Sequence, residues 1–480
     1  MRNSSPHNSR SLLYYPILLI VFGAGMWLIL STGLHLNRRD SGSGPPNYGA
    51  PVTTVASPSA TPQPAEVVAP GNLRSALSIL LLQIIVIIIV ARIFGRLFRR
   101  LGQPPVMGEM VAGIALGPSV LGLFSPQTVN FLFPASSLPT LGVLSQIGVV
   151  LFMFVVGMEL DLQHLREKAS SAIMVSHASI IVPFLLGSAM ALLLYPTLAP
   201  AGTSFAPFAL FMGIAMSITA FPVLGRILQD RHLTHFRLGS LALACAAIDD
   251  VSAWCMLALV IALAKSGGLK ASLVTIALTL AFIAAMFYIV RLPLARIVLR
   301  RISDLRGPRG LLAGVLAFVL ASAWVTEIIG IHALFGGFLA GVVMPAFPEF
   351  RIFLKERVEA FSAAALLPLF FVFTGLRTQV GLLNNYSDWL ICLGIIIVAI
   401  AGKLGGSMLM ARWTSMSWRD SFSLGVLLNT RGLVELVVLN IGYDLGILSA
   451  RIFVMMVIMA LVTTFMTTPL LSLINLQRQA

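Results

Sequence analysis

Two adjacent carboxylates, Asp249 and Asp250, lie in the middle of the apolar stretch LACAAIDDVSAW (243–254). An ionised carboxylate is costly in an apolar environment, so such a residue usually marks an ion pathway or has a charged partner. Successive residues on a helix point about 100° apart, and the two carboxylates therefore cannot occupy one helix face. We expect the two aspartates to have different roles.

Lys403 is a natural partner for one of these carboxylates. Its ammonium group lies in the apolar stretch AIAGKLGG (399–406), where small neighbours permit close approach between helices. We predict that Lys403 pairs with one aspartate and leaves the other for a different purpose. The alternative is a buried ion pair whose purpose is purely structural.

The apolar stretch MSITAFPV (216–223) contains a helix breaker beside two hydroxyl groups. Pro222 has no amide hydrogen for the carbonyl of Ile218, and it disfavours helical geometry in the residue before it. Free backbone carbonyls are therefore expected beside the hydroxyls of Ser217 and Thr219. The pattern predicts either a discontinuous helix that offers oxygen ligands or an ordinary proline kink.

A second interruption lies in the stretch LNTRGL (428–433), where three polar residues and a glycine break an apolar run. The alternative interpretation of this stretch is the polar end of an ordinary helix. Glu435 follows Arg431 by one helical turn, so these two side chains are expected to form a local pair. Two interruptions and a carboxylate pair together favour two discontinuous helices near the middle of the membrane.

The composition identifies the solvent of this chain as a lipid bilayer. Hydrophobic residues make up 58% of the 480 residues and charged residues only 10%, which is typical of a polytopic membrane protein. The net charge of +14 does not indicate nucleic-acid binding, because the basic residues lie in short loops between apolar runs. The three cysteines lie inside apolar runs and predict neither a disulfide framework nor a metal site.

Apolar runs of roughly 20 residues or more predict an all-α protein with fourteen membrane spans. The first lies near 11–32, and thirteen more begin near 75, 104, 139, 171, 207, 238, 271, 308, 332, 359, 387, 421 and 450. We interpret 1–37 as an uncleaved membrane anchor, with a cleaved signal peptide as the alternative. Residues 38–74, rich in Pro, Ser, Gly and Ala, are expected to be a flexible external linker before a transmembrane domain at 75–475.

Clusters of Lys and Arg between the predicted spans set the orientation, since short cytoplasmic loops are enriched in basic residues. We expect a multi-pass protein of the cell (inner) membrane whose N-terminus and C-terminus both face the cytoplasm. The clusters that support this orientation are Arg92/Arg96/Arg99/Arg100, Arg166/Lys168, Arg226/Arg231/Arg237, Arg291 to Arg309, Arg351/Lys355/Arg357 and Arg412/Arg419.

Two short motifs occur in both halves of the transmembrane domain. VAGIALGP (111–118) is echoed by LAGVVMP (339–345), and LFMFVVG (151–157) is echoed by LFFVFTG (369–375). The members of each pair fall on predicted spans of opposite direction, as in an inverted repeat of six spans, one linking span and six further spans. The alternative is chance similarity between apolar glycine-rich helices.

Several motifs in order resemble the monovalent cation/proton antiporter superfamily, specifically its branch of Kef-type bacterial and plant cation/H⁺ exchangers. The resemblance extends from residue 75 to about residue 475. The motifs that carry it are GQPPVMGEMVAGIALGPSVLG (102–122), SITAFPVLGRIL (217–228), AAIDDV (246–251), GKLGG (402–406) and NTRGLVELVVLNIG (429–442).

The resemblance implies a thirteen-span inverted-repeat antiporter fold, to which this chain adds one N-terminal span that is unusual for the family. It also implies a homodimer, built from a dimerisation domain and a mobile core domain in which two unwound helices cross beside the paired carboxylates. Asp250 is then the residue that carries the ion and the proton, while Asp249 pairs with Lys403. The residues expected around the crossing are Ser217 and Thr219 as cation ligands with Asp250, and Asn429, Arg431 and Glu435 as supports.

The chemistry of a buried carboxylate suffices for exchange. Burial disfavours its charged form and a bound Na⁺ or K⁺ favours it, so cation and proton compete for one site. If only the occupied site can cross, competition becomes obligatory exchange by alternating access. We therefore predict a secondary active transporter of Na⁺ or K⁺ and H⁺, without enzymatic activity or a cofactor. The alternatives are a cation channel or a solute symporter on the same fold, and a transport-inactive sensor.

Overall fold

A computed structural model of the chain describes residues 7–37, 75–159, 169–231, 233, 236–265, 269–302 and 308–474. The regular structure of these residues is entirely helical, in agreement with the predicted all-α class. The helices before the middle of the chain are α1 His7–Asn37, α2 Ala76–Arg100, α3 Pro105–Leu116, α4 Leu121–Phe124, α5 Pro126–Leu132, α6 Leu138–Glu159, α8 Ala169–Leu198, α9 Phe205–Ser217, α10 Phe221–Asp230 and α11 Arg237–Lys265.

The remaining helices include several short π-helical and 3₁₀ stretches that continue or join the longer elements. They are α12 Leu269–Ala285, η2 Met286–Val290, α13 Arg291–Ile302, α14 Pro308–Ile329, α15 Ala333–Val342, α16 Pro348–Leu354, η3 Lys355–Glu359, η4 Ser362–Leu366, α17 Leu367–Arg377, η5 Val380–Leu382, α18 Tyr386–Ile400, η6 Ala401–Gly405, α19 Gly406–Trp413, α20 Trp418–Leu428, α21 Leu433–Asp444 and α22 Ala450–Leu473.

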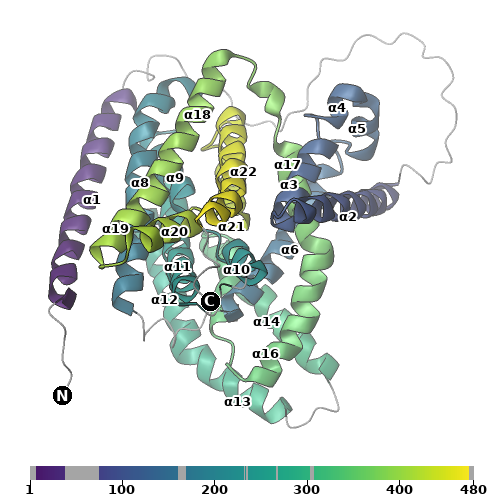
Figure 1. The fold of residues 1–480 in the computed structure, drawn as a ribbon. Helices are drawn as coiled ribbons and strands as arrows, with labels where there is room; N and C mark the ends of the chain where they lie inside the picture. Colours follow the sequence, from purple (N-terminus) through teal and green to yellow (C-terminus); the bar gives the residue numbers. More distant parts are fainter. Residues whose placement is uncertain are drawn as a thin grey trace.

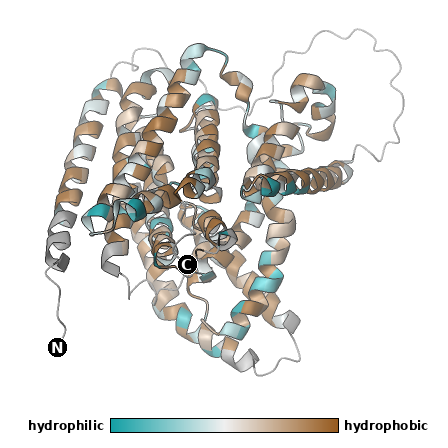
Figure 2. Cartoon of the chain, in the orientation of Figure 1, coloured by the Kyte–Doolittle hydropathy of each residue, from teal (hydrophilic) through white to brown (hydrophobic). Residues whose placement is uncertain are grey.

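Within the described residues, eleven helices are long and apolar enough to cross a membrane, and the bent pair α20 and α21 makes a twelfth. Many of their large apolar side chains are exposed, as expected where lipid rather than water is the neighbour. Apolar residues make up most of the length of these helices (Figure 2). The segments expected near 207 and 332 correspond to the shorter apolar helices α9 and α15. The polytopic helical fold is thus confirmed, while fourteen crossings stay a prediction.

The N-terminal helix α1 lies beside α8 and α9 at one edge of the molecule (Figure 1). The ring of Phe22 packs edge-on against Phe184, with 5.6 Å between the ring centroids. A Cβ atom on Gly33 would lie 1.9 Å from the ring of Phe205, so the glycine is what allows this contact. The predicted N-terminal span therefore packs on α9, the helix that ends within the interrupted stretch at 216–223. The predicted linker at 38–74 lies outside the described residues.

The repeated motifs pack crosswise between the two halves of the chain. Helix α3 carries the first six residues of VAGIALGP and contacts α17, which carries LFFVFTG. Helix α15 carries the start of LAGVVMP and contacts α6, which carries LFMFVVG. A Cβ atom on Gly113 would lie 2.6 Å from the Cα atom of Val372. A Cβ atom on Gly341 would lie 2.1 Å from the carbonyl oxygen of Phe154. Both pairs therefore bring backbone against backbone, which supports the predicted repeat.

Substitution of either glycine should disrupt these contacts. Gly113→Ala and Gly341→Ala should each lower the free energy of unfolding by about 1–3 kcal/mol, because the added methyl group must displace backbone atoms. Gly314→Ala on α14 is the matched control, since nothing lies within 4 Å of a Cβ atom there. Thermal melting of the purified protein in detergent measures the effect. Equal melting temperatures for Gly341→Ala and Gly314→Ala would contradict the close packing.

Candidate ion-binding site

The first predicted break is present in the structure. Helix α9 ends at Ser217 and α10 begins at Phe221, and the residue after the helix end, Ile218, has extended backbone angles (φ −73°, ψ 138°). Pro222 is the second residue of α10 and has no amide hydrogen to donate to the carbonyl of Ile218. The proline therefore marks a discontinuous helix rather than a simple kink.

The second predicted break separates α20, which ends at Leu428, from α21, which begins at Leu433. The two helices are bent by 45° relative to each other. A Cβ atom on Gly432 would lie 2.7 Å from Cγ2 of Val223 on α10, so a glycine at this position permits the two broken helices to meet. Both interruptions inferred from sequence are therefore breaks in the structure.

Hydrogen bonds join the two breaks directly. The backbone N–H of Ala220 donates to the carbonyl of Thr430 at 3.0 Å, and the Thr219 hydroxyl lies 3.1 Å from the carbonyl oxygen of Leu428. The guanidinium group of Arg431 donates to the carbonyls of Ala215 at 2.9 Å and Met216 at 2.6 Å, near the end of α9. The crossing implied by the family resemblance is thus present, and carbonyls freed by one break are satisfied by the other.

Asp249 is the fully satisfied member of the carboxylate pair. It is completely buried and accepts hydrogen bonds from the hydroxyls of Ser176 (2.5 Å), Ser179 (2.7 Å) and Thr219 (2.6 Å). Lys403 Nζ lies 3.0 Å from Oδ2 of Asp249, and both side chains are fully buried. The predicted ion pair is therefore present, and hydroxyl donors on α8 and in the first break reinforce it.

Lys403 connects this ion pair to the first break. Its ammonium group donates to the carbonyl of Ser217 at 2.5 Å, and it also lies 3.0 Å from the carbonyl oxygen and 2.9 Å from the hydroxyl of Ser179. The lysine lies within the π-helical stretch η6, and π-bulges inside helices frequently occur at functional sites. The ammonium group thereby satisfies a carbonyl that the break leaves without a helical partner.

Asp250 lies on the same helix in a contrasting environment. Its side chain is 1% exposed, and neither carboxylate oxygen has a hydrogen-bonding partner among the described residues. A buried acid with unused oxygens is an arrangement that a proton or a small cation can complete.

Arg431, in the second break, and Glu435, in the first turn of α21, form the predicted local pair. Nη1 of Arg431 lies 3.3 Å from Oε2 of Glu435, and both side chains are fully buried. Asn429 points its amide nitrogen toward the sulfur of Met466 at 3.8 Å, while its oxygen has no hydrogen-bonding partner among the described residues. Arg431 thus supports the crossing through its guanidinium group, and the roles of Asn429 and Glu435 stay predictions.

The predicted cation ligands Ser217 and Thr219 have other partners in this structure. The Ser217 hydroxyl donates to the carbonyl of Ile214 at 2.9 Å, and the Thr219 hydroxyl donates to Asp249. Their role as ligands to a cation at Asp250 therefore stays a prediction. Sequence reasoning missed Ser176 and Ser179, although two hydroxyls at a spacing of three in an apolar helix place both on one helix face.

Comparisons with known proteins agree with this architecture. The family described as sodium/hydrogen exchanger, transmembrane, matches residues 85–473. The Na⁺/H⁺ antiporter NhaS4 of Synechocystis sp. is 44% identical over 398 residues, which cover 82% of this chain and 97% of the relative. The cation/H⁺ antiporter 17 of Arabidopsis thaliana is 41% identical over 400 residues, or 83% of this chain, and this chain spans about half (48%) of the plant protein.

The fold also has a solved counterpart. The structure of the sodium proton antiporter MjNhaP1 from Methanocaldococcus jannaschii aligns with a TM-score of 0.57 at 16% identity, and the alignment covers 82% of this chain and 96% of that chain. At this identity the likeness shows the fold alone. The sequence matches confirm the predicted branch, and the chain belongs to the sodium/hydrogen exchanger family within the monovalent cation/proton antiporter superfamily.

Proposed function

We propose that this chain exchanges a monovalent cation, Na⁺ or K⁺, for protons across the membrane, and that Asp250 binds the cation and the proton in turn. The observation that carries this proposal is the contrast between the two aspartates. Asp249 has three hydroxyl donors and an ammonium group, whereas both oxygens of Asp250 are buried without a hydrogen-bonding partner. The membership in a family of transporters also makes the chain a transporter rather than an enzyme.

Competition for Asp250 follows from electrostatics. A buried carboxylate without a counter-charge is strongly destabilising, and either a proton or a small cation removes that cost. The two ligands exclude each other because each needs the same carboxylate. A site that crosses the membrane only when occupied then couples cation movement in one direction to proton movement in the other.

The crossing of the two breaks supplies the element that moves in this proposal. Arg431 joins the second break to α9, and Lys403 joins Asp249 on α11 to Ser217 at the end of α9. These bonds tie both breaks and Asp249 into one unit, so the neighbouring Asp250 can change its access without losing its surroundings. Alternating access by a rigid displacement of this unit is consistent with its internal bonding.

The name of the cyanobacterial relative contains Na⁺ and the name of the plant relative leaves the cation open, so both ions belong in the test. Proton flux in proteoliposomes, measured with Na⁺, K⁺ and Li⁺ in turn, separates the proposal from its alternatives. A channel passes cations without moving protons, and a symporter requires an organic solute. Proton flux that depends on the cation and needs no organic solute supports exchange.

The cellular setting is also part of the proposal. We infer a homodimer in the cell (inner) membrane with a cytoplasmic C-terminus, on the basis of the family resemblance and the distribution of basic clusters. Cysteine cross-linking between purified protomers and labelling of a C-terminal tag in intact and permeabilised cells test the two parts separately.

Asp250→Asn should abolish cation-driven proton flux and leave the protein folded, because asparagine keeps the shape of the side chain and removes its charge. Asp388→Asn is the control, since Asp388 is also buried but lies fifteen residues, or about 22 Å along a helix, from Lys403. The measurement is proton flux in proteoliposomes, with melting temperature as the folding check. Wild-type flux in Asp250→Asn would remove this residue from the mechanism.

Lys403→Gln should lower the stability of the folded protein by about 3–5 kcal/mol at neutral and alkaline pH, because it leaves the Asp249 carboxylate buried without a counter-charge. Protonation of Asp249 relieves this cost. The folded variant then binds a proton that the unfolded chain does not, so stability falls as pH rises. The net charge moved per cycle should also fall if Lys403 exchanges a proton during turnover.

Melting temperatures from pH 5 to 9 test this expectation for the wild type, Lys403→Gln and the double variant Lys403→Gln/Asp249→Asn. The double variant should recover stability, because it lacks the buried charge. A deficit that is the same at every pH, or a double variant no more stable than Lys403→Gln, would show that the pair is not the cause.

Thr219→Val should weaken the apparent cation affinity more than it lowers the maximum rate, if the hydroxyl oxygen is a cation ligand. Thr219→Ser is the matched control, because it keeps the hydroxyl that donates to Asp249. Cation titrations of proton flux give both quantities. An unchanged half-saturating concentration in Thr219→Val, together with a lower melting temperature, would assign the hydroxyl to the support of Asp249 alone.

A further inference from the structure

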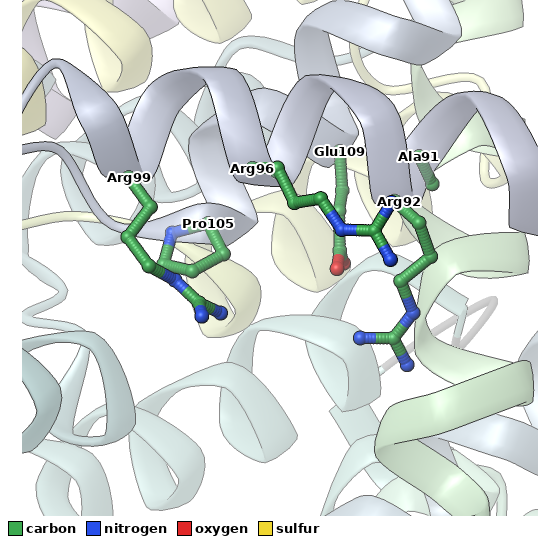
Figure 3. A pocket seen from close by; sticks show the side chains of 7 residues that line it. Ala91, Arg92, Arg96, Arg99, Pro105 and Glu109 are labelled. Atoms are coloured by element: carbon green, nitrogen blue, oxygen red, sulfur yellow. The ribbon is translucent and has the colours of Figure 1, made fainter.

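A charged pocket lies between α2 and α3, apart from the crossing helices (Figure 3). Its volume is about 330 Å³. Since a water molecule occupies about 30 Å³ in the liquid, the pocket has room for a group of about ten non-hydrogen atoms. The residues that line it are Ala91, Arg92, Gly95, Arg96, Arg99, Pro105 and Glu109.

Glu109 is the buried member of this pocket. Its side chain is 7% exposed, and it makes no hydrogen bond and no ion pair within 4.0 Å among the described residues. Figure 3 shows its carboxylate aimed into the space beside the guanidinium groups of Arg92 and Arg96, while the guanidinium group of Arg99 lies farther along the pocket, near Pro105. The oxygens of this largely buried residue meet the pocket without a hydrogen-bond donor from the protein, so they favour a ligand group that brings N–H donors and positive charge.

The arginines provide the opposite chemistry. The guanidinium group of Arg92 already donates hydrogen bonds within the protein, since its Nη2 lies 3.1 Å from the carbonyl oxygen of Ala364 and 3.3 Å from that of Ala363. Arg96 and Arg99 are exposed and make no hydrogen bond or ion pair with any described residue. Their planar guanidinium groups match the oxygens of a phosphate.

The position of the pocket favours a ligand from the bilayer. The arginines occupy the last turns of α2, where an apolar helix ends and a membrane surface is expected. A stripe of exposed apolar side chains with a spacing of four residues runs along α2 beside the pocket. It consists of Ile85 (54% exposed), Ile89 (53%), Ile93 (53%) and Leu97 (48%). Acyl chains can lie along this stripe while a headgroup enters the pocket.

We propose that this pocket binds the headgroup of an aminophospholipid, with the phosphate on Arg96 and Arg99 and the primary ammonium group on Glu109. Phosphatidylethanolamine has both groups a few bonds apart, and its headgroup is within the size of the pocket. A choline headgroup has no N–H donor for Glu109. A glycerol headgroup has hydroxyl donors but no positive charge to offset the buried carboxylate.

The test uses the full-length wild-type protein, purified and depleted of lipid in a neutral detergent. Melting temperature is followed while phosphatidylethanolamine, phosphatidylcholine or phosphatidylglycerol is added. Phosphatidylethanolamine should reach half of its stabilising effect at a concentration about tenfold lower than the other two lipids, since one charge-assisted bond corresponds to about that factor. Soluble phosphoethanolamine and inorganic phosphate, added in parallel, should stabilise far less than the lipid.

Three variants assign the parts of the headgroup. Glu109→Gln should lose the preference for phosphatidylethanolamine, and Arg96→Gln should weaken stabilisation by all three lipids about tenfold. Arg100→Gln is the matched control, because Arg100 lies on the same helix end outside the lining of the pocket. Since Arg96 is exposed, its variant keeps the test decisive even if Glu109→Gln fails to fold.

Several outcomes would overturn the proposal. Equal stabilisation of the wild type by the three lipids, or an unchanged preference in a folded Glu109→Gln variant, would remove the role of Glu109. An equal loss in Arg100→Gln and Arg96→Gln would reduce the binding to general attraction between basic residues and lipid. Stabilisation by soluble phosphoethanolamine that matches the lipid would assign the pocket to a soluble ligand.

Discussion

The cost of burying charge in an apolar protein is the constraint on which this structure depends. Asp249 and Lys403 lie fully buried, and each is stable there only because the other is present with additional bonds. Those bonds come from α8 through Ser176 and Ser179 and from the first helix break through Ser217 and Thr219. One ion pair therefore fixes the relative positions of four helical segments that are far apart in the sequence.

The same constraint explains why the site uses two neighbouring carboxylates instead of one. A carboxylate that already accepts bonds from four donors has little capacity left to bind a further ligand. Its neighbour on α11 points about 100° away and falls outside this set of donors. Asp250 is consequently buried beside a preorganised group but has unused oxygens. A single aspartate could not be both the anchor of the crossing and an exchangeable site.

The sequence predicted the parts of the site whose physical signature is local. Pro222 predicts the first break, a run of polar residues with Gly432 predicts the second, and the position of Lys403 in an apolar run predicts a partner. These signals depend only on neighbours along the chain. The helical class and the approximate positions of most spans follow in the same way from hydropathy.

Other features could not be predicted, because they depend on which helices come together. Ser176 and Ser179 look like ordinary small residues of an apolar helix until Asp249 is placed against them. Thr219 was predicted as a ligand of a cation, yet the side chain it meets in the structure is Asp249. Counting apolar runs of about 20 residues as spans also predicts full spans near 207 and 332, where the structure has the shorter helices α9 and α15. A broken or short helix does not need to cross the membrane by itself.

The glycine contacts and the buried ion pair hold different parts of the fold together. In the pairs α3 with α17 and α6 with α15, backbone lies against backbone, so these pairs have little room to slide. The crossing is instead held by hydrogen bonds and charges, which join α9, α11, η6 and the second break internally. The crossing can therefore shift as a rigid body relative to the glycine-packed helix pairs. Such a displacement breaks contacts between these two parts and leaves the contacts within each part intact. In the proposed exchange cycle, Asp250 would therefore change its access while Asp249 and Lys403 remain paired, unless proton exchange at Lys403 releases them.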